Sequence, residues 1–182
     1  MHERAAEFAA RARDRYGVDL DVLEFDAGTE TAAAAADAVG CDTAAIASTI
    51  VVSLSGEDVA VDGVAESEGS AESEAIADAD GGSLVAAITS GANRLDLDAV
   101  AAHFEADDAA MADPARIREV VGWSIGGVPP LCHDAALPTV FDPTLAGYDT
   151  VYGAAGTPSA VFAVDPDRLA SLAEATTVDL TE

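Results

Sequence analysis

Apolar and polar residues alternate along the chain with two different periods, and these periods predict helices and strands. Near the start, Phe8, Ala12 and Tyr16 recur at the spacing of a helix face, and Gly17 is placed to end that helix. Strands are predicted where apolar residues alternate singly or form short β-branched runs. By these criteria we expect further helices over residues 29–40, 94–104, 113–122 and 165–175, strands over residues 18–25, 46–54, 83–91, 138–142, 150–156 and 159–164, and a turn or short helix over residues 142–148.

Several helices carry capping signals at their ends. Asp113 and Asp165 each precede a proline, which suits the first helical position because its missing N–H has no partner there. For the second helix, either Thr29 or Thr31 is a candidate N-cap, and Gly40 marks the C-terminal end. These local signals predict where the helices begin and end.

Helices and strands are mixed without the regular alternation of a parallel βαβ fold, and the middle strands lie close together in sequence. This order predicts one α+β domain over residues 1–182, built on a mixed, largely antiparallel and curved sheet flanked by helices. Curling of the sheet towards a barrel is an alternative. Residues 55–82 are rich in Gly, Ser, Asp and Glu, so we expect an acidic, mobile insertion with at most a short strand at residues 59–61.

The segment WSIGGVPPLCHD, residues 123–134, fits neither period. Gly126 and Gly127 loosen the backbone, and the two prolines that follow remove N–H donors, so no regular helix is expected. Large apolar residues, including the single tryptophan Trp123, argue against a disordered linker. We expect an ordered loop of fixed shape, and such loops often carry functional groups.

Acidic residues outnumber basic ones over the whole chain. There are 34 Asp and Glu residues against eight basic residues, all of them Arg, and the formal net charge is −26. This charge repels itself in a compact fold, but at about 1 M salt the Debye length is only about 3 Å. We therefore expect a protein of a halophilic lineage with a salt-rich cytoplasm. An acidic interaction module is the alternative, although the acids are not gathered in one tail.

Several functional classes lack their sequence signatures. The first segment bears arginines and no apolar core run, so no secretory signal is predicted, and no window approaches the roughly 20 apolar residues that span a bilayer. Cys41 and Cys132 make no disulfide framework or metal-ligand spacing, and no Gly-rich phosphate loop, HExxH or CxxC occurs. We expect a cytoplasmic protein without a metal, a cofactor or membrane contact.

The order of the predicted elements resembles the YbaK/EbsC-type aminoacyl-tRNA deacylase family, which is related to the editing domain of prolyl-tRNA synthetases. The specific part is the element GGVPP after a helix that ends in Gly, followed later by a strand ending in AAG. The resemblance covers most of the chain except the first helix and residues 55–82, and it implies the family's fold and ester hydrolysis. The matching blocks are TETAAAAADAVG, IASTIVVSL, TSGANRLDLDAV, AMADPARIREVVGWSIGGVPP, LPTVFDPTLAGYDTVYGAAGTPSAVF and VDPDRLASL.

In the resemblance, the loop at residues 126–130 shapes a small aminoacyl pocket. Glycines let backbone N–H groups approach a ligand, and amides aimed at a developing oxyanion lower an acyl-transfer barrier by about 3–4 kcal/mol each. A simple tight turn after the helix is the alternative for the two glycines. The resemblance implies catalytic roles for Gly126, Gly127, Val128 and Ser48, and substrate-binding roles for Thr49, Gly91, Asn93, Arg94, Pro129, Pro130, His133, Asp142, Ala155 and Gly156.

One position departs from the family pattern. Members typically carry a Lys in the strand that corresponds to IASTIVV, and here the position is Ser48. A Lys would supply a cation for a phosphate or for the substrate carbonyl, whereas Ser offers only a neutral hydrogen bond. One explanation is that the chain avoids Lys, and that Arg94 or Asn93 covers part of the role of the missing Lys. The other is that catalysis is lost or changed.

Simpler roles compete with several of these assignments. Ser48 and Thr49 suit a strand without any further function. His133 either lines the pocket mouth or caps the loop, and since it is adjacent to Cys132 we do not expect a nucleophilic pair. Asp142 also suits an N-cap.

Two further segments have alternatives of the same kind. Residues 153–157 are small, so they either leave space for the terminal adenosine or form a tight hairpin turn. Arg94 either contacts a phosphate or pairs with Asp96 or Asp98.

Taken with the resemblance, these observations predict a free-standing trans-editing hydrolase that removes a small amino acid, such as Ala or Cys, from proline tRNA. Its expected partners are the tRNA 3′ end with its aminoacyl ester and, as a further candidate, an aminoacyl-tRNA synthetase. Two alternatives stay open. One is a non-catalytic aminoacyl-, nucleotide- or tRNA-binding module that has lost the Lys, and the other is an esterase for another small ester.

Overall fold

The computed structural model of the chain describes residues 3–25, 31–55, 83–123, 128–133, 137–157 and 159–181. The strand predicted at residues 59–61 lies outside these ranges. In chain order the elements are α1 (Glu3–Tyr16), β1 (Asp21–Glu24), α2 (Ala32–Val39), the 3-10 helix η1 (Thr43–Ala45), β2 (Ile46–Ser55), β3 (Ser83–Ser90), α4 (Leu97–His103), β4 (Asp108–Met111), α5 (Pro114–Val120), β5 (Thr139–Phe141), the 3-10 helix η2 (Pro143–Gly147), β6 (Val151–Ala154), β7 (Ala160–Val164), α6 (Pro166–Leu172) and β8 (Thr176–Thr177).

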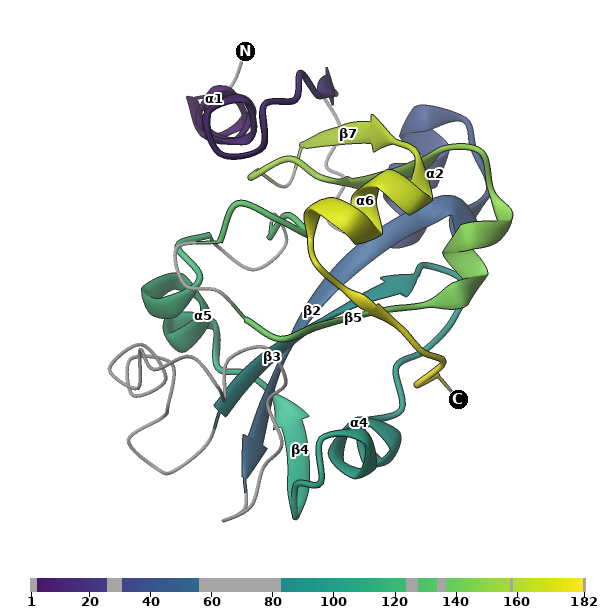
Figure 1. Cartoon of the computed structure of the whole chain (residues 1–182). Helices are drawn as coiled ribbons and strands as arrows, with labels where there is room; N and C mark the ends of the chain where they lie inside the picture. The colour runs from purple at the N-terminus through teal and green to yellow at the C-terminus, as the bar shows by residue number, and fades with distance from the viewer. Residues whose placement is uncertain are drawn as a thin grey trace.

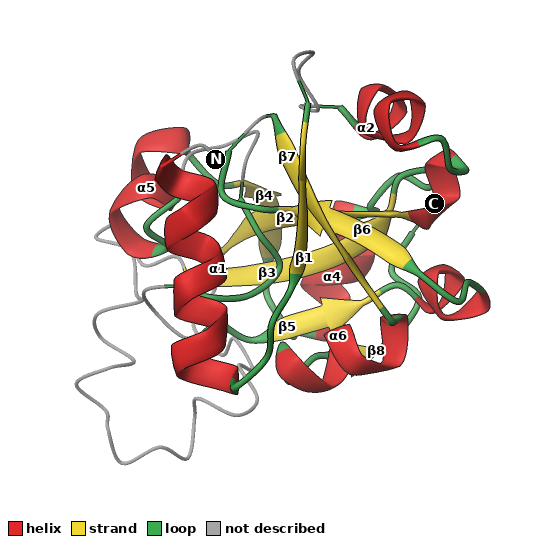
Figure 2. Cartoon of the chain, turned by 90° about the horizontal axis from the view of Figure 1, so that it is seen from above, coloured by secondary structure: helices red, strands yellow, loops and turns green. Residues whose placement is uncertain are grey.

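The described strands form one mixed sheet in the order β1-β7-β6-β2-β3-β5-β8, with β4 pairing with β2 off this path (Figures 1 and 2). The antiparallel pairs are β1–β7, β6–β7, β2–β3 and β2–β4, and the parallel pairs are β2–β6, β3–β5 and β5–β8. The predicted α+β class with a mixed, largely antiparallel sheet flanked by helices is confirmed. The pattern did not predict β4 and β8, which are short and largely exposed.

The sheet buries a hydrophobic cluster on each face because alternate residues of its strands point to opposite sides. One cluster packs the sheet against Phe8 of α1, Ile117 of α5 and Leu169 of α6. A second packs it against Val100 and Phe104 at α4, and a third, smaller cluster packs α2 against Ile46 and Val161. Figure 1 shows α1 and α4 at opposite sides of the sheet. Within the described residues, no helix is long and apolar enough to cross a membrane.

Helix ends follow the predicted capping signals. Thr31 is the N-cap of α2, with its Oγ1 accepting from the Ala34 amide at 3.0 Å, and Gly40 ends that helix with φ 86°. Asp113 and Asp165 cap α5 and α6 as expected. These ends were predictable because each depends on a few adjacent residues.

One edge of β2 is paired only at its two ends. β6 pairs with Ile46 and Ala47, and β4 pairs with residues 52–55, whereas β3 runs along the whole opposite edge. In the described part of the chain, no strand pairs with residues 48–51 on the first edge. The sheet is therefore split beside the middle of β2.

Candidate functional site

A cavity of about 320 Å³ lies beside this split. Its volume is in the range of pockets that hold small ligands. The lining is mostly small and apolar, and the described side chains that form it carry no charge. The lining residues are Thr31, Ala32 and Ala35 near α2; residues 46–51 of β2; Met111, Ala112 and Ile117; Val128; Tyr152, Gly153 and Ala154 of β6; and Val161 of β7.

Thr49 is the distinctive polar residue of this lining. Its Oγ1 is buried, and no hydrogen-bond partner for it exists among the described residues. By contrast, the hydroxyl of Thr31 caps α2. A buried polar group without a partner costs about 1–3 kcal/mol, so such groups are rare and call for an explanation.

The backbone of Thr49 also faces the split. In an antiparallel pair, successive residues alternate between bonding to one neighbour strand and to the other. The carbonyl oxygen of Ile46 accepts from Gly91 beside β3, and that of Val51 accepts from Ala112 at the end of β4. By this alternation, the N–H and C=O of Thr49 point to the same edge as those of Val51, and no strand within the described ranges pairs with Thr49 there. Three polar groups of one residue are thus gathered at the cavity.

Residues 128–133 form part of the cavity wall and the layer behind it. Val128 lines the cavity, and Pro130 packs so closely against Gly153 that a Cβ there would lie 3.2 Å from its ring. Behind them, the Nε2–H of His133 donates to the carbonyl oxygen of Pro129 at 2.7 Å. His133 therefore ties the loop to itself from a buried position. Gly126 and Gly127, the predicted catalytic glycines, lie outside the described residues.

Asp142 forms a second polar cluster at the carboxyl end of β5. Its Oδ2 accepts from the Ser90 amide and from Asn93 Nδ2, each at 3.0 Å, and its Oδ1 accepts from the Thr144 amide at 2.8 Å. The Asp142 amide donates to the carbonyl oxygen of Ile88, and the Ser90 amide donates to the Asp142 side chain. These two bonds extend the β3–β5 pairing beyond Phe141, the last residue of β5. Asp142 is also the predicted N-cap, here of η2.

The remaining predicted binding residues lie outside the cavity lining. Arg94 is exposed, and Ala155 is buried in the core. Gly91 and Gly156 serve close packing: a Cβ would lie 2.5 Å from Ala32 at the first and 2.6 Å from Trp123 at the second, where φ is also +91°. Of the predicted residues, the structure brings Ser48, Thr49 and Val128 together at the cavity.

The sequence patterns did not predict most of the lining residues, and Met111, Tyr152 and Thr31 show why. Met111, whose side chain is 57% exposed, stands on the unpredicted strand β4. The sequence pattern predicts Tyr152 only as part of a strand and Thr31 only as a helix cap. Local secondary structure accounts for these residues, so nothing in the sequence marked them as part of a binding site.

The two cysteines do not supply a nucleophile at this site. Burial raises the pKa of the Cys132 thiol from 9.0 to about 11, although Arg15 and Arg11 oppose the change. Burial also raises the pKa of Cys41. Both thiols are therefore protonated at neutral pH, and the thiol is the unreactive form. Within the described ranges, no group of three or more His, Cys, Asp or Glu side chains is placed to hold a metal ion.

Comparisons with known proteins point in one direction. A family model for the aminoacyl-tRNA editing domain matches residues 26–172. The crystal structure of a candidate trans-editing enzyme for prolyl tRNA synthetase shares 31% identity and a TM-score of 0.80, and the match covers 100% of this chain and 99% of that one.

Two other solved structures match over nearly their whole length. A scaffold protein from computational epitope grafting shares 28% identity and a TM-score of 0.79, covering 100% of this chain and 99% of that chain. The hypothetical protein APE2540 has 22% identity and a TM-score of 0.73, with 99% and 100% covered, and supports the fold alone.

Proposed function

The chain belongs to the aminoacyl-tRNA editing domain family, and from that membership we propose that it is a trans-editing hydrolase. It removes a wrongly attached small amino acid, such as Ala or Cys, from proline tRNA. The observation that carries this proposal is the cavity at the split of the sheet, where the three polar groups of Thr49 meet a small, uncharged lining. The solved structure described as a candidate trans-editing enzyme supports the same reaction.

The lining matches a small aminoacyl group. Alanines of α2, β2 and β6 and the Cβ-less Gly153 leave room for the substrate, while Ile46, Val51 and Ile117 supply apolar contact. Because packed interiors resist movement, we expect these walls to limit the size of the substrate side chain that enters. Selection by size follows from this arrangement.

Hydrolysis of this ester needs little contribution from charged side chains. A water molecule attacks the ester carbonyl carbon, the bond to the ribose oxygen breaks, and the ribose hydroxyl leaves with a proton. Negative charge develops on the carbonyl oxygen, and fixed neutral donors in a dry site stabilise it. The hydroxyl and N–H of Thr49 are such donors, whereas Ser48, the preceding residue of β2, lines the cavity from the opposite face of the sheet. The amides of residues 126–128 remain the sequence-based candidates for the same task.

The uncharged lining also favours a second candidate, the non-catalytic module that binds aminoacyl esters. Ser48 lies in the cavity lining where the family resemblance expects a Lys, and no described lining residue supplies a cation in its place. A pocket that holds the ester without hydrolysing it would protect the ester in proportion to the protein added. A hydrolase would instead cleave many ester molecules for each protein molecule.

The acidic chain must reach a polyanionic tRNA. We propose that recognition is confined to the 3′ end, where stacking and groove shape count for more than phosphate contacts. Salt screens the repulsion between the two molecules, so affinity should change little or rise as KCl is increased. A steep fall in affinity with salt, as basic tRNA-binding surfaces show, would contradict this mode of binding.

The test is deacylation of Ala-, Cys-, Ser- and Pro-charged tRNA by the purified protein in multimolar KCl. Multiple turnovers on one mischarged tRNA, with Pro-tRNA spared, are expected. Ser48→Lys and Gly127→Val are assayed beside the native chain. Activity that appears only in Ser48→Lys, with stoichiometric protection by the native chain, would favour the binding module instead.

A further inference from the structure

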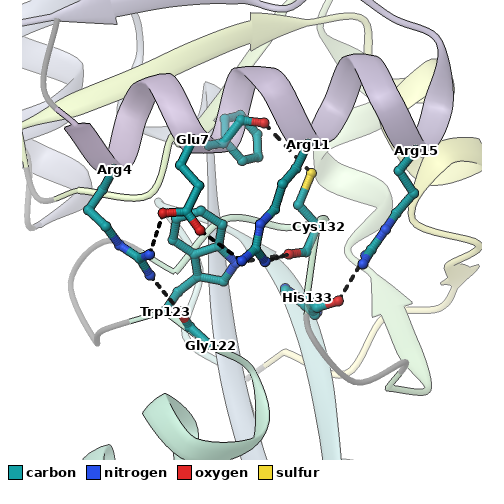
Figure 3. Close-up of polar contacts among 9 residues, drawn as sticks. Arg4, Glu7, Arg11, Arg15, Gly122, Trp123, Cys132 and His133 are labelled. Carbon is teal, nitrogen blue, oxygen red and sulfur yellow. Dashed lines mark hydrogen bonds and ion pairs between the residues drawn. The ribbon is translucent and has the colours of Figure 1, made fainter.

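Helix α1 contacts the loop that forms the cavity wall through a row of arginines. Arg4, Arg11 and Arg15 lie on one face of the helix and point to the same segment (Figure 3). Arg4 donates to the carbonyl oxygen of Gly122, Arg11 to that of Cys132 at 3.5 Å, and Arg15 to that of His133 at 2.8 Å. The arginines thus reach both described ends of residues 122–133.

Trp123 joins the two ends of this segment. The guanidinium groups of Arg4 and Arg11 lie 4.2 and 5.1 Å from its ring centre, and Glu7 bridges these two arginines with contacts of 2.7 Å each. The indole N–H donates to the carbonyl oxygen of Cys132 at 2.9 Å. The ring is fully buried, and stacked guanidinium groups on such a ring are attractive.

The contacts converge on a residue with an unusual backbone. Cys132 has φ +67°, which a residue with a Cβ rarely adopts. Its amide donates to the Tyr16 hydroxyl at 3.2 Å, and its carbonyl accepts from Trp123 and Arg11. A strained conformation persists only where its surroundings hold it, and here α1 supplies most of that support.

The chemistry of the loop explains why it needs an outside partner. Pro129 and Pro130 have no N–H, so the segment cannot satisfy its carbonyl groups in a regular ladder. Three of the eight basic residues of this acidic chain are used for these carbonyls. All three come from a helix that precedes the region matched by the family model.

We propose that Arg15 and Arg11 are positioning residues: α1 holds Cys132 and His133, and through them sets the place of the cavity wall at Val128. The link is short, because His133 is bonded to Pro129 and Pro130 packs against Gly153 of the cavity. The part of this proposal that concerns catalysis rests on the proposed function. The part that concerns the loop does not.

The test uses hydrogen exchange and deacylation on the full chain with three variants. Arg15→Gln removes the charged donor to His133, Arg15→Lys keeps one, and Arg13→Gln is the control. Arg13 lies on the same helix, but its described bond is to Asp19, away from the loop.

Exchange at residues 131–133 should rise by about tenfold or more in Arg15→Gln, because a hydrogen bond to a charged group is lost. Arg15→Lys should recover most of the protection, and Arg13→Gln should match the native chain. Exchange in β3 should change less than about twofold in all variants. Equal exchange in Arg15→Gln and the native chain, or an equal rise in Arg13→Gln or in β3, would overturn the proposal.

Deacylation gives the second readout. If the native chain turns over, kcat of Arg15→Gln should fall by about tenfold while KM stays within about twofold, because the wall beside the ester moves and the tRNA contacts do not. A rise in KM alone would overturn the positioning role. If the native chain shows no turnover, the proposed function fails, and the exchange data alone decide whether α1 positions the loop.

Discussion

Two polar regions of this molecule differ in whether their groups are satisfied. At the end of β5, both carboxylate oxygens of Asp142 accept hydrogen bonds, from Ser90, Asn93 and Thr144. At the split beside β2, the hydroxyl of Thr49 is buried without a described partner, and its backbone groups face an edge that no described strand covers. Both residues were candidates for substrate binding on the sequence alone.

The difference separates a structural role from a functional one. A buried polar group whose atoms are already hydrogen-bonded stabilises the fold and has little left to offer a ligand. A buried polar group without a partner lowers stability, and a ligand that bonds it recovers the loss. Two residues that are both binding candidates by sequence therefore differ in role once their hydrogen-bond partners are known. By this criterion we propose that the site lies at Thr49, whereas the hydrogen bonds of Asp142 hold β3, β5 and η2 together.

Asp142→Asn should give the largest loss of stability. Whichever way the new amide is turned, its NH₂ group faces an N–H that was bonded to the carboxylate, so the free energy of unfolding should fall by about 2–3 kcal/mol. Chemical denaturation measures it. The control is Asp165→Asn at the exposed N-cap of α6, where Asn serves as well as Asp. If the folded Asp142→Asn lost its deacylation rate, the structural assignment would be wrong.

Cys132 extends the comparison to a buried group that titrates. Its thiol is protonated in the folded state up to a pKa of about 11, whereas in the unfolded chain its pKa is near 9.0. The unfolded state therefore loses its proton first, and stability should fall between about pH 9 and pH 11 by about 2 kcal/mol. Urea unfolding at several pH values measures this. Cys132→Ala should flatten the fall, and an unchanged slope would contradict the assignment.

Thr49→Val and Thr139→Val should shift stability by smaller amounts of opposite sign. Thr139, also in the sheet, donates its hydroxyl to the carbonyl oxygen of Leu137 at 2.9 Å, so its loss should cost about 1 kcal/mol. Thr49→Val removes an unpaired hydroxyl and should raise stability by up to about 1 kcal/mol. Thermal unfolding of the two variants in parallel gives the comparison. A loss at Thr49 equal to that at Thr139 would show that Thr49 has a partner after all.

Much of the fold could be predicted because its signals are local. The Asp-Pro starts of α5 and α6 and the Thr31 cap of α2 each depend on adjacent residues. β4 and β8 could not be predicted, because short exposed strands are defined by their pairing rather than by their own sequence.

The candidate site was less predictable for the same reason. That Ser48 and Thr49 meet Val128 depends on the split of the sheet, which is a property of several strands together. Likewise, Asp142 obtains its hydrogen bonds from Ser90 and Asn93, which are about 50 positions away in sequence. Residue type gave the candidates, and only tertiary contacts separated them.

The most direct test of this account is the single-turnover deacylation rate of a mischarged tRNA with the native chain, Thr49→Val and Thr49→Ser. Val keeps the shape and removes the hydroxyl, whereas Ser keeps the hydroxyl. We expect the rate of Thr49→Val to fall by about 100-fold, the typical effect of losing one oxyanion donor, while Thr49→Ser stays within about fivefold of the native rate. A Thr49→Val variant that hydrolyses the ester at the native rate would contradict the central claim.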